Sequence, residues 1–176
     1  RLVQLPYSPA PTPQTDDRKE NIPELTPYNM PAVAGDLIHL CLERLAGLTD
    51  SELREFDMTG WQAWWQRYLS RNLFDVTEQR QAQLRVEQAV ANILQDKRGQ
   101  WLLSSDREEA TSELRVSRIA EDGRLREMII DRTFVEDGIR WIVDYKSAVP
   151  AEGENLDDFL RYQENQYKGQ LLSYRD

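Results

Sequence analysis

The chain has 176 residues, of which 40% are apolar, so it fits one domain with a hydrophobic core and is not disordered as a whole. Its 31 acidic and 22 basic side chains give a formal net charge of −9, which argues against tight nucleic-acid binding by this chain alone, because phosphate binding usually leaves a basic footprint. A single cysteine, Cys41, excludes an intramolecular disulfide and any zinc or iron–sulfur site built from several thiolates of this chain, and no apolar run approaches the roughly 20 residues of a membrane span, so we expect a cytoplasmic protein.

The first 97 residues are predicted to form an extended arm followed by helices. Seven of the eight prolines lie within residues 6–31, and residues 1–30 show no periodicity, which predicts a linker or arm. One helix is expected from Gly35, a second from about Thr59 and a long third over residues 77–97. Apolar residues at helical spacing mark the expected buried faces: Leu37, Ile38, Cys41, Leu42, Leu45, Trp61, Trp64, Trp65 and Leu69. Four arginines are interpreted as a solvated face, with contact to a DNA backbone as the alternative: Arg67, Arg71, Arg80 and Arg85.

The periodicity then changes from helical to alternating, which predicts a meander of short strands. The expected strands cover residues 101–103, 112–117, 125–135 and 139–146, with turn signals at residues 121–123 and 136–138. A last helix is expected over residues 156–174. This order predicts an α+β fold, with helices packed on a mostly antiparallel sheet.

An acid and a base, Asp144 and Lys146, stand two residues apart in the last expected strand. Side chains alternate along a strand, so both should point to one face. The other face is predicted to be the core side, with Ile139, Trp141, Val143 and Tyr145. Asp131 follows two apolar residues in the preceding strand, where a carboxylate is costly to bury without a partner such as a metal ion.

The register of the predicted hairpin decides whether the two acids meet. Asp131 lies opposite Asp144 if Val135 pairs with Arg140, through a four-residue connection over residues 136–139 or through a bulge. If Val135 paired instead with Ile139, Asp131 would face away from Asp144. A site that uses both acids therefore requires the first register.

These residue types suit metal-assisted cleavage of a phosphodiester. Mg²⁺, for which Mn²⁺ can substitute, activates a water molecule and stabilises the leaving oxygen, and hard cations prefer oxygen ligands. We expect Asp131 and Asp144 to hold the ion, helped by the backbone carbonyl of Tyr145. Lys146 is expected to stabilise the transition state or to orient the attacking water.

The only histidine, His39, lies on the first expected helix, on the side away from the apolar residues. Asp36 and Glu43 share this side, Glu43 at i+4. A neutral imidazole from His39 would complete the shell of the ion. The plainer alternatives are that His39 is an ordinary surface histidine, and that Asp144 with Lys146 is an exposed strand pair worth under roughly 1 kcal/mol.

Four segments resemble the ordered motifs of one nuclease family: residues 35–39 (GDLIH), 130–132 (IDR), 143–147 (VDYKS) and 170–174 (QLLSY). They are similar to the RecB-type branch of the PD-(D/E)XK nucleases, which forms the C-terminal nuclease of RecB and AddA helicase–nucleases. A lone D-x-K is a weak signal, whereas four motifs in the right order are specific. The resemblance implies a restriction-endonuclease-like fold, with a mixed, mostly antiparallel central sheet flanked by helices and an N-terminal helical segment.

The resemblance also implies roles for single residues. His39, Asp131 and Asp144 correspond to the metal ligands of the family, and Lys146 to its catalytic lysine. Three further residues would support the site or line it near the DNA: Glu113, Gln170 and Tyr174. The plainer alternatives are that Glu113 is a solvated strand residue and that Gln170 and Tyr174 belong to an ordinary amphipathic helix face. The implied nuclease domain covers residues 31–176 and is expected to be truncated at its C-terminal end, because the family continues with a further strand.

The implied function is Mg²⁺-dependent hydrolysis of DNA, more of the exonuclease type, by the nuclease module of a RecB/AddA-like helicase–nuclease in double-strand-break repair and recombination. The implied partners are single-stranded DNA, helicase domains of the same parent chain and a partner subunit, with no membrane. Two alternatives stay open. One is a catalytically silent scaffold that binds DNA or a subunit through a nuclease fold, and the other is a stand-alone exonuclease of the same fold.

Overall fold

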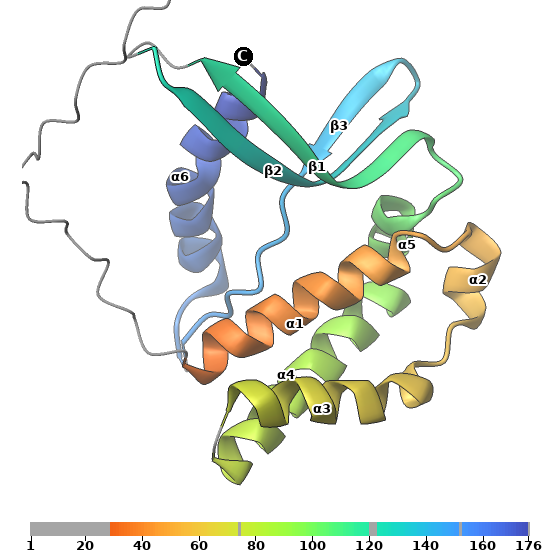
Figure 1. The fold of residues 1–176 in the computed structure, drawn as a ribbon, viewed down its shortest axis with the longest axis vertical. Helices are drawn as coiled ribbons and strands as arrows, with labels where there is room; N and C mark the ends of the chain where they lie inside the picture. Colours follow the sequence, from red (N-terminus) through yellow and green to blue (C-terminus); the bar gives the residue numbers. More distant parts are fainter. Residues whose placement is uncertain (1–28, 74, 120–122, 152, 176) are drawn as a thin grey trace, which may run out of the picture.

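The computed structural model describes residues 29–73, 75–119, 123–151 and 153–175, without the side chains of residues 118, 126 and 170–175 (Figure 1). The expected arm of residues 1–30 lies outside these residues except for its last two. The elements are α1 (Met30–Leu45), α2 (Asp50–Glu55), η1 (Met58–Trp61), α3 (Gln62–Asn72), α4 (Val76–Gln95), α5 (Lys97–Leu103), β1 (Glu108–Ile119), β2 (Leu125–Glu136), β3 (Ile139–Val143) and α6 (Leu156–Arg175).

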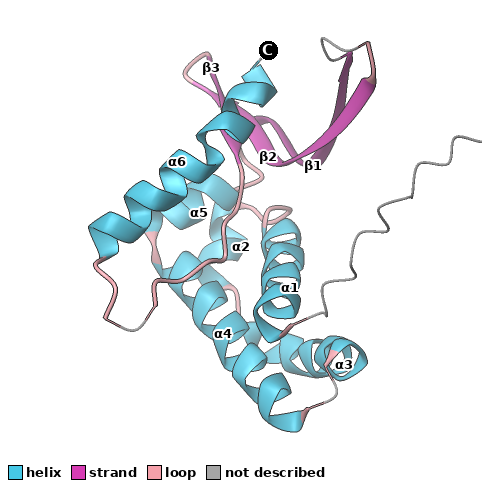
Figure 2. Cartoon of the chain, turned by 90° about the vertical axis from the view of Figure 1, so that its left-hand side faces the viewer, coloured by secondary structure: helices cyan, strands magenta, loops and turns pink. Residues whose placement is uncertain are grey.

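The described part of the chain has two layers and one flanking helix, α6. Helices α1 to α5 form one layer, and the other is a three-stranded antiparallel sheet in the order β1-β2-β3 (Figure 1). Helix α1 runs beneath the sheet and packs against α3 and α4 on its far side, while α6 flanks the sheet away from α3 (Figure 2). The predicted α+β class, an antiparallel sheet flanked by helices, is confirmed. None of the helices within the described ranges is both long and apolar enough to cross a membrane.

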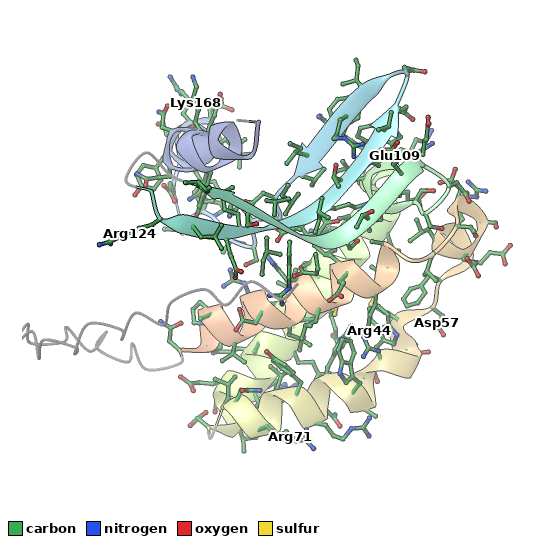
Figure 3. The ribbon with its side chains drawn as sticks, turned by 45° about the horizontal axis from the view of Figure 1, so that its top comes forward. Arg44, Asp57, Arg71, Glu109, Arg124 and Lys168 are labelled. Carbon is green, nitrogen blue, oxygen red and sulfur yellow. The ribbon has the colours of Figure 1, made fainter. Side chains whose placement is uncertain are left out.

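Helix α1 is the central helix of the apolar layer. It begins at Met30, five residues before the predicted start, because the side chain of Asn29 accepts a hydrogen bond from the amide of Ala32 at 3.1 Å and caps the helix. Its predicted apolar face is buried, and Cys41 accepts a hydrogen bond from the indole of Trp65 at 3.2 Å. Charged side chains such as Asp57, Arg71 and Lys168 point outward instead (Figure 3).

The prediction of a strand over residues 101–103 is wrong, because these residues belong to helix α5. Asp96 caps this helix by accepting hydrogen bonds from the amides of Arg98 and Gly99. Gly99 lies so close to the end of α4 that an added Cβ would stand 2.4 Å from the carbonyl oxygen of Ile93. A short apolar run is compatible with either a strand or a helix. Here the cap at Asp96 and the close packing of Gly99 on α4 favour the helix.

The hairpin of β2 and β3 has the register that the site requires. Val135 pairs with Arg140 and not with Ile139, and the ladder extends one pair further, so the connection has two residues in place of four. Both turn residues have positive φ, 52° at Asp137 and 73° at Gly138, as in the type I′ turns that match the twist of the strands. The structure therefore has the register that a site with both acids requires, although neither the four-residue connection nor a bulge provides it.

Strand β3 is shorter than expected and its predicted core face is only partly buried. It ends at Val143, so Asp144 and Lys146 follow the strand and do not lie in it. The reason is that the amide of Tyr145 donates to the carboxylate of Asp131 at 2.6 Å and makes no ladder bond to a carbonyl. Of the predicted core residues, Tyr145 packs against the helical core, whereas Ile139 is 59% exposed.

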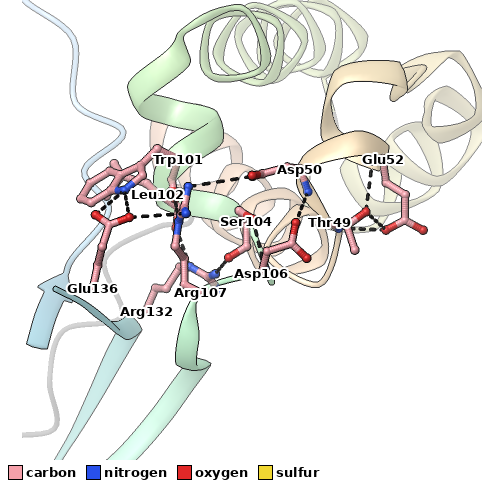
Figure 4. A network of polar contacts seen from close by, with 10 residues as sticks. All are labelled: Thr49, Asp50, Glu52, Trp101, Leu102, Ser104, Asp106, Arg107, Arg132 and Glu136. Carbon is pink, nitrogen blue, oxygen red and sulfur yellow. Dashed lines mark hydrogen bonds and ion pairs between the residues drawn. The ribbon is translucent and has the colours of Figure 1, made fainter. Parts of the chain in front are cut away.

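A buried arginine joins the sheet to the helices. Arg132, in β2, is 1% exposed, and its guanidinium donates to the carbonyl oxygens of Leu102 and Ser104 at 2.5 Å (Figure 4). A third carbonyl partner is Ala46 at 3.2 Å, just after the end of α1. These carbonyls belong to the C-terminal ends of α5 and α1, where cations are favoured. Arg132 therefore fixes the neighbouring Asp131 relative to both helices.

Candidate active site

The candidate site is centred on Asp131, whose side chain is 14% exposed. One carboxylate oxygen accepts the hydrogen bond from the amide of Tyr145 and lies 4.0 Å from Nδ1 of His39. Burial raises the pKa of Asp131 above its ordinary value, while the Tyr145 amide and His39 oppose the rise. Its position between α1 and the segment after β3 joins three distant parts of the chain.

His39, on the polar side of α1, projects toward the sheet and comes within 4.0 Å of Asp131. Its side chain is 36% exposed, so it is open to solvent on one side. Its ring stands edge-on to the ring of Tyr145, with centroids 6.0 Å apart. Tyr145 is half-buried against the helical core, and burial raises the pKa of its phenol group, so its ring supports His39 from the core side.

Glu113 adds a second carboxylate from β1. The pairs Ser112↔Arg132 and Leu114↔Ile130 place it opposite Asp131 in the register, and its φ of +52° is unusual for a residue other than glycine. Burial raises the pKa of Glu113, and the charge of Asp131 and then that of Glu43 raise it further. Glu113 and Asp131 therefore repel each other across the sheet.

Glu43 was not proposed as a site residue from the sequence. The signal was present, because Glu43 stands at i+4 from His39 on the polar side of the first helix. Its charge reaches Glu113 strongly enough to raise the pKa of that carboxyl group. The site thus holds one more acid than the motifs indicated.

Asp144 and Lys146 form an ion pair just beyond β3. The Asp144 side chain is only 6% exposed, and its charge raises the pKa of Asp131, so the two carboxyl groups face the same region. The Lys146 ammonium also lies over the ring of Tyr167 in α6, 4.1 Å from the centroid. Sequence reasoning missed Tyr167, because a side chain from α6 can be matched to Lys146 only once the helix is placed.

The structure therefore brings most of the predicted residues together, as neighbours of Asp131: His39, Glu113, Asp144, Tyr145 and Lys146. Gln170 and Tyr174 belong to α6, but their side chains lie outside the described residues. The one cysteine is not part of the site. Burial raises the pKa of the Cys41 thiol to about 12, so it offers no thiolate near neutral pH.

The donor chemistry fits a hard divalent cation. Carboxylates and one imidazole are its usual ligands, and a cation would relieve the repulsion among Glu43, Glu113 and Asp131. Within the described ranges, however, no three His, Cys, Asp or Glu side chains converge closely enough to hold a metal ion. Asp144 is turned toward Lys146, so its carboxylate would have to rotate to join Asp131 as a ligand.

Comparison with known proteins is consistent with this geometry. The sequence model of one family matches residues 17–176, and its description is the PD-(D/E)XK nuclease superfamily. This range includes every residue of the candidate site. Searches of curated proteins and of solved structures found no match to the chain.

Proposed function

Since the chain belongs to the PD-(D/E)XK nuclease superfamily, we propose that it hydrolyses DNA phosphodiester bonds with the help of a divalent metal ion, Mg²⁺ by preference and Mn²⁺ as a substitute. The observation that carries the proposal is the convergence of His39, Asp144 and Lys146 on Asp131 in the one hairpin register that permits it. An exposed ion pair alone would not require this convergence.

The proposed roles follow from position and charge. Asp131, Asp144, His39 and the carbonyl of Tyr145 would hold the ion, which when bound supplies an activated water and stabilises the leaving oxygen. The ammonium of Lys146 stabilises the negative charge that develops on the phosphoryl oxygens. The ring of Tyr167 and the carboxylate of Asp144 keep Lys146 beside the site.

We infer a finer function from the four ordered motifs. They support a nuclease module of the RecB/AddA type, in which helicase domains feed single-stranded DNA past the site during double-strand-break repair. The net charge of −9 supports a role for other domains or a partner subunit in holding the DNA, because the chain has no overall basic surface charge. A stand-alone exonuclease of the same fold would have to bind DNA by itself.

Replacing the catalytic lysine tests the proposal. Lys146→Ala should reduce Mg²⁺-dependent cleavage of a labelled single-stranded oligonucleotide by about 100-fold or more, because a preorganised charge at the transition state is lost. Lys168→Ala is the matched control, since Lys168 lies on α6 and points away from the molecule (Figure 3). Cleavage that is equal in wild type and Lys146→Ala would contradict the assigned mechanism.

A second candidate function is a scaffold that binds DNA or a subunit without cutting. The observation in its favour is the pairing of Asp144 with Lys146, which occupies the carboxylate that a metal ion would use. The acids around Asp131 argue against it, because a scaffold gains nothing from carboxylates that repel one another beside the partly buried Asp131. Calorimetric titration with Mn²⁺ distinguishes the two functions. Binding that depends on Asp131 and Asp144 favours the nuclease, and the absence of such binding favours the scaffold.

A further inference from the structure

The segment that carries Lys146 is not held by the sheet. Strand β3 ends at Val143, and residues 144–150, all of them described, form neither helix nor strand. A catalytic side chain works only if it is held within about 0.5 Å of its productive position. Contacts other than a β-ladder must therefore position Lys146.

Two hydrogen bonds hold the residues on either side of Lys146. On one side, the amide of Tyr145 donates to the carboxylate of Asp131 at 2.6 Å. On the other side, the carbonyl oxygen of Ser147 accepts a hydrogen bond from Nη2 of Arg85 at 2.6 Å. Arg85 lies in α4, 62 residues away in the chain, and no motif of the site includes it.

Arg85 differs from the other arginines that were interpreted as a solvated face. Arg67 and Arg80 are exposed, whereas Arg85 is half-buried, and its Nε is buried without a hydrogen-bond partner among the described residues. It lines a groove of about 390 Å³ between α1, α4 and residues 145–149. Burying a guanidinium is costly. The hydrogen bond to Ser147 is the compensation that the structure shows.

Ser147 lies against α1 on a second side. An added Cβ on Gly35 would stand 2.8 Å from the hydroxyl oxygen of Ser147, so a larger residue at this position would make the serine side chain shift. Ser147 thus lies between Gly35 and Arg85. Both contacts act on the residue next to Lys146, and neither reaches the reacting atoms.

We propose that Arg85 is a positioning residue for Lys146, and that it acts by anchoring the carbonyl of Ser147 to α4. This inference rests on the proposed function, because it assigns Lys146 a catalytic role. It extends the site to a helix that contributes no ligand and no catalytic group. The guanidinium holds the backbone on the C-terminal side of Lys146, and Asp131 holds it on the N-terminal side.

The first test compares catalysis with binding. Arg85→Met keeps an unbranched apolar stem but removes the donor, so it should lower the single-turnover cleavage rate about 10-fold or more and leave the affinity for an oligonucleotide within about two-fold. Arg85→Lys should recover part of the rate, because an ammonium can still donate to the carbonyl. Arg80→Met, on the exposed side of the same helix, should match the wild type. A wild-type rate in Arg85→Met overturns the proposal, and so does a loss of affinity equal to the loss of rate.

The second test needs neither DNA nor metal. Amide hydrogen exchange, followed by NMR, should be about 10-fold faster at Tyr145 in Arg85→Met than in wild type and unchanged in Arg80→Met, because the segment loses the hydrogen bond that holds its backbone to α4. Equal exchange overturns the inference even if Lys146→Ala abolishes cleavage. If the wild type does not cleave DNA, the proposed function fails, while exchange still decides whether Arg85 anchors the segment. If Arg85→Met does not fold, Arg85→Leu, which also lacks the donor, replaces it in both tests, and unchanged exchange with an unchanged rate overturns the proposal.

Discussion

At the scale of single residues, Asp131 destabilises the fold that it serves. Burial raises its pKa, so over a range of pH the folded chain keeps a proton that the unfolded chain has lost. Stability is therefore lost as the pH rises through this window, and above it the folded state carries the full cost of the buried charge. Carboxylates in such surroundings are typical of sites selected for function and not for stability.

Removing this charge should stabilise the protein. We expect Asp131→Asn to melt at a higher temperature than wild type at pH 7, by about 3 °C for each kcal/mol relieved, and the gain should shrink as the pH falls toward about 4. Glu164→Gln, an exposed site on α6, controls for the change in net charge. Thermal unfolding followed by circular dichroism between pH 4 and 8 measures the melting temperatures of both variants and of the wild type. A variant that is less stable than wild type at pH 7 would show that the hydrogen bond from Tyr145 outweighs the burial of the charge.

Part of the candidate site was predictable from residue spacing alone. Alternation and turn geometry reduced the hairpin to two registers, of which only the one that pairs Val135 with Arg140 lets Asp131 meet Asp144, and the structure has this register. Arg85 and Tyr167 were not predictable, since each meets the Lys146 segment only through the packing of a distant helix. Glu43 was intermediate. Its spacing from His39 was visible, and its effect on Glu113 required the sheet to be placed over α1.

At the scale of elements, the packing of α5 on α4 depends on a glycine. Gly99→Ala should lower the free energy of unfolding by about 1–3 kcal/mol, because its Cβ would overlap the backbone of Ile93, which cannot give way. Gly60→Ala is the matched control, since an added Cβ there meets nothing within 4 Å. Urea denaturation compares the two. Equal midpoints would mean that α5 can shift away from α4 at little cost.

The same glycine explains why the element prediction failed at residues 101–103. The long helix was predicted to end at residue 97 with a strand soon after it, whereas Gly99 lies in the first turn of α5, after the cap at Asp96. The longer helices α1, α3, α4 and α6 were predictable because several turns repeat one apolar face. Helix α2 was missed, although Thr49 and Glu52 form a capping box that marks its start. Six residues are too few for periodicity, so this cap was its only signal.

At the scale of the whole molecule, the site lies where the two layers meet. His39 belongs to the helical layer, while Asp131 belongs to the sheet and Asp144 to the segment that follows it. The buried Arg132 and the Arg85–Ser147 contact join the same layers on either side. An ion bound by these three side chains would therefore join the layers, and its binding energy would add to the stability of the whole chain.

Metal binding should consequently raise the melting temperature. At about ten times its Kd, Mg²⁺ or Mn²⁺ should add about 1.4 kcal/mol to the free energy of unfolding, a shift of roughly 3–6 °C for a chain of this size. Asp131→Asn should abolish the shift, and His39→Ala should reduce it, because one ligand of the set is lost while the acids remain. Ca²⁺ in place of Mg²⁺ tests whether the shift needs a small cation. An equal shift in wild type and Asp131→Asn would mean that the ions bind elsewhere on this acidic chain, and no shift in any of them would favour the scaffold.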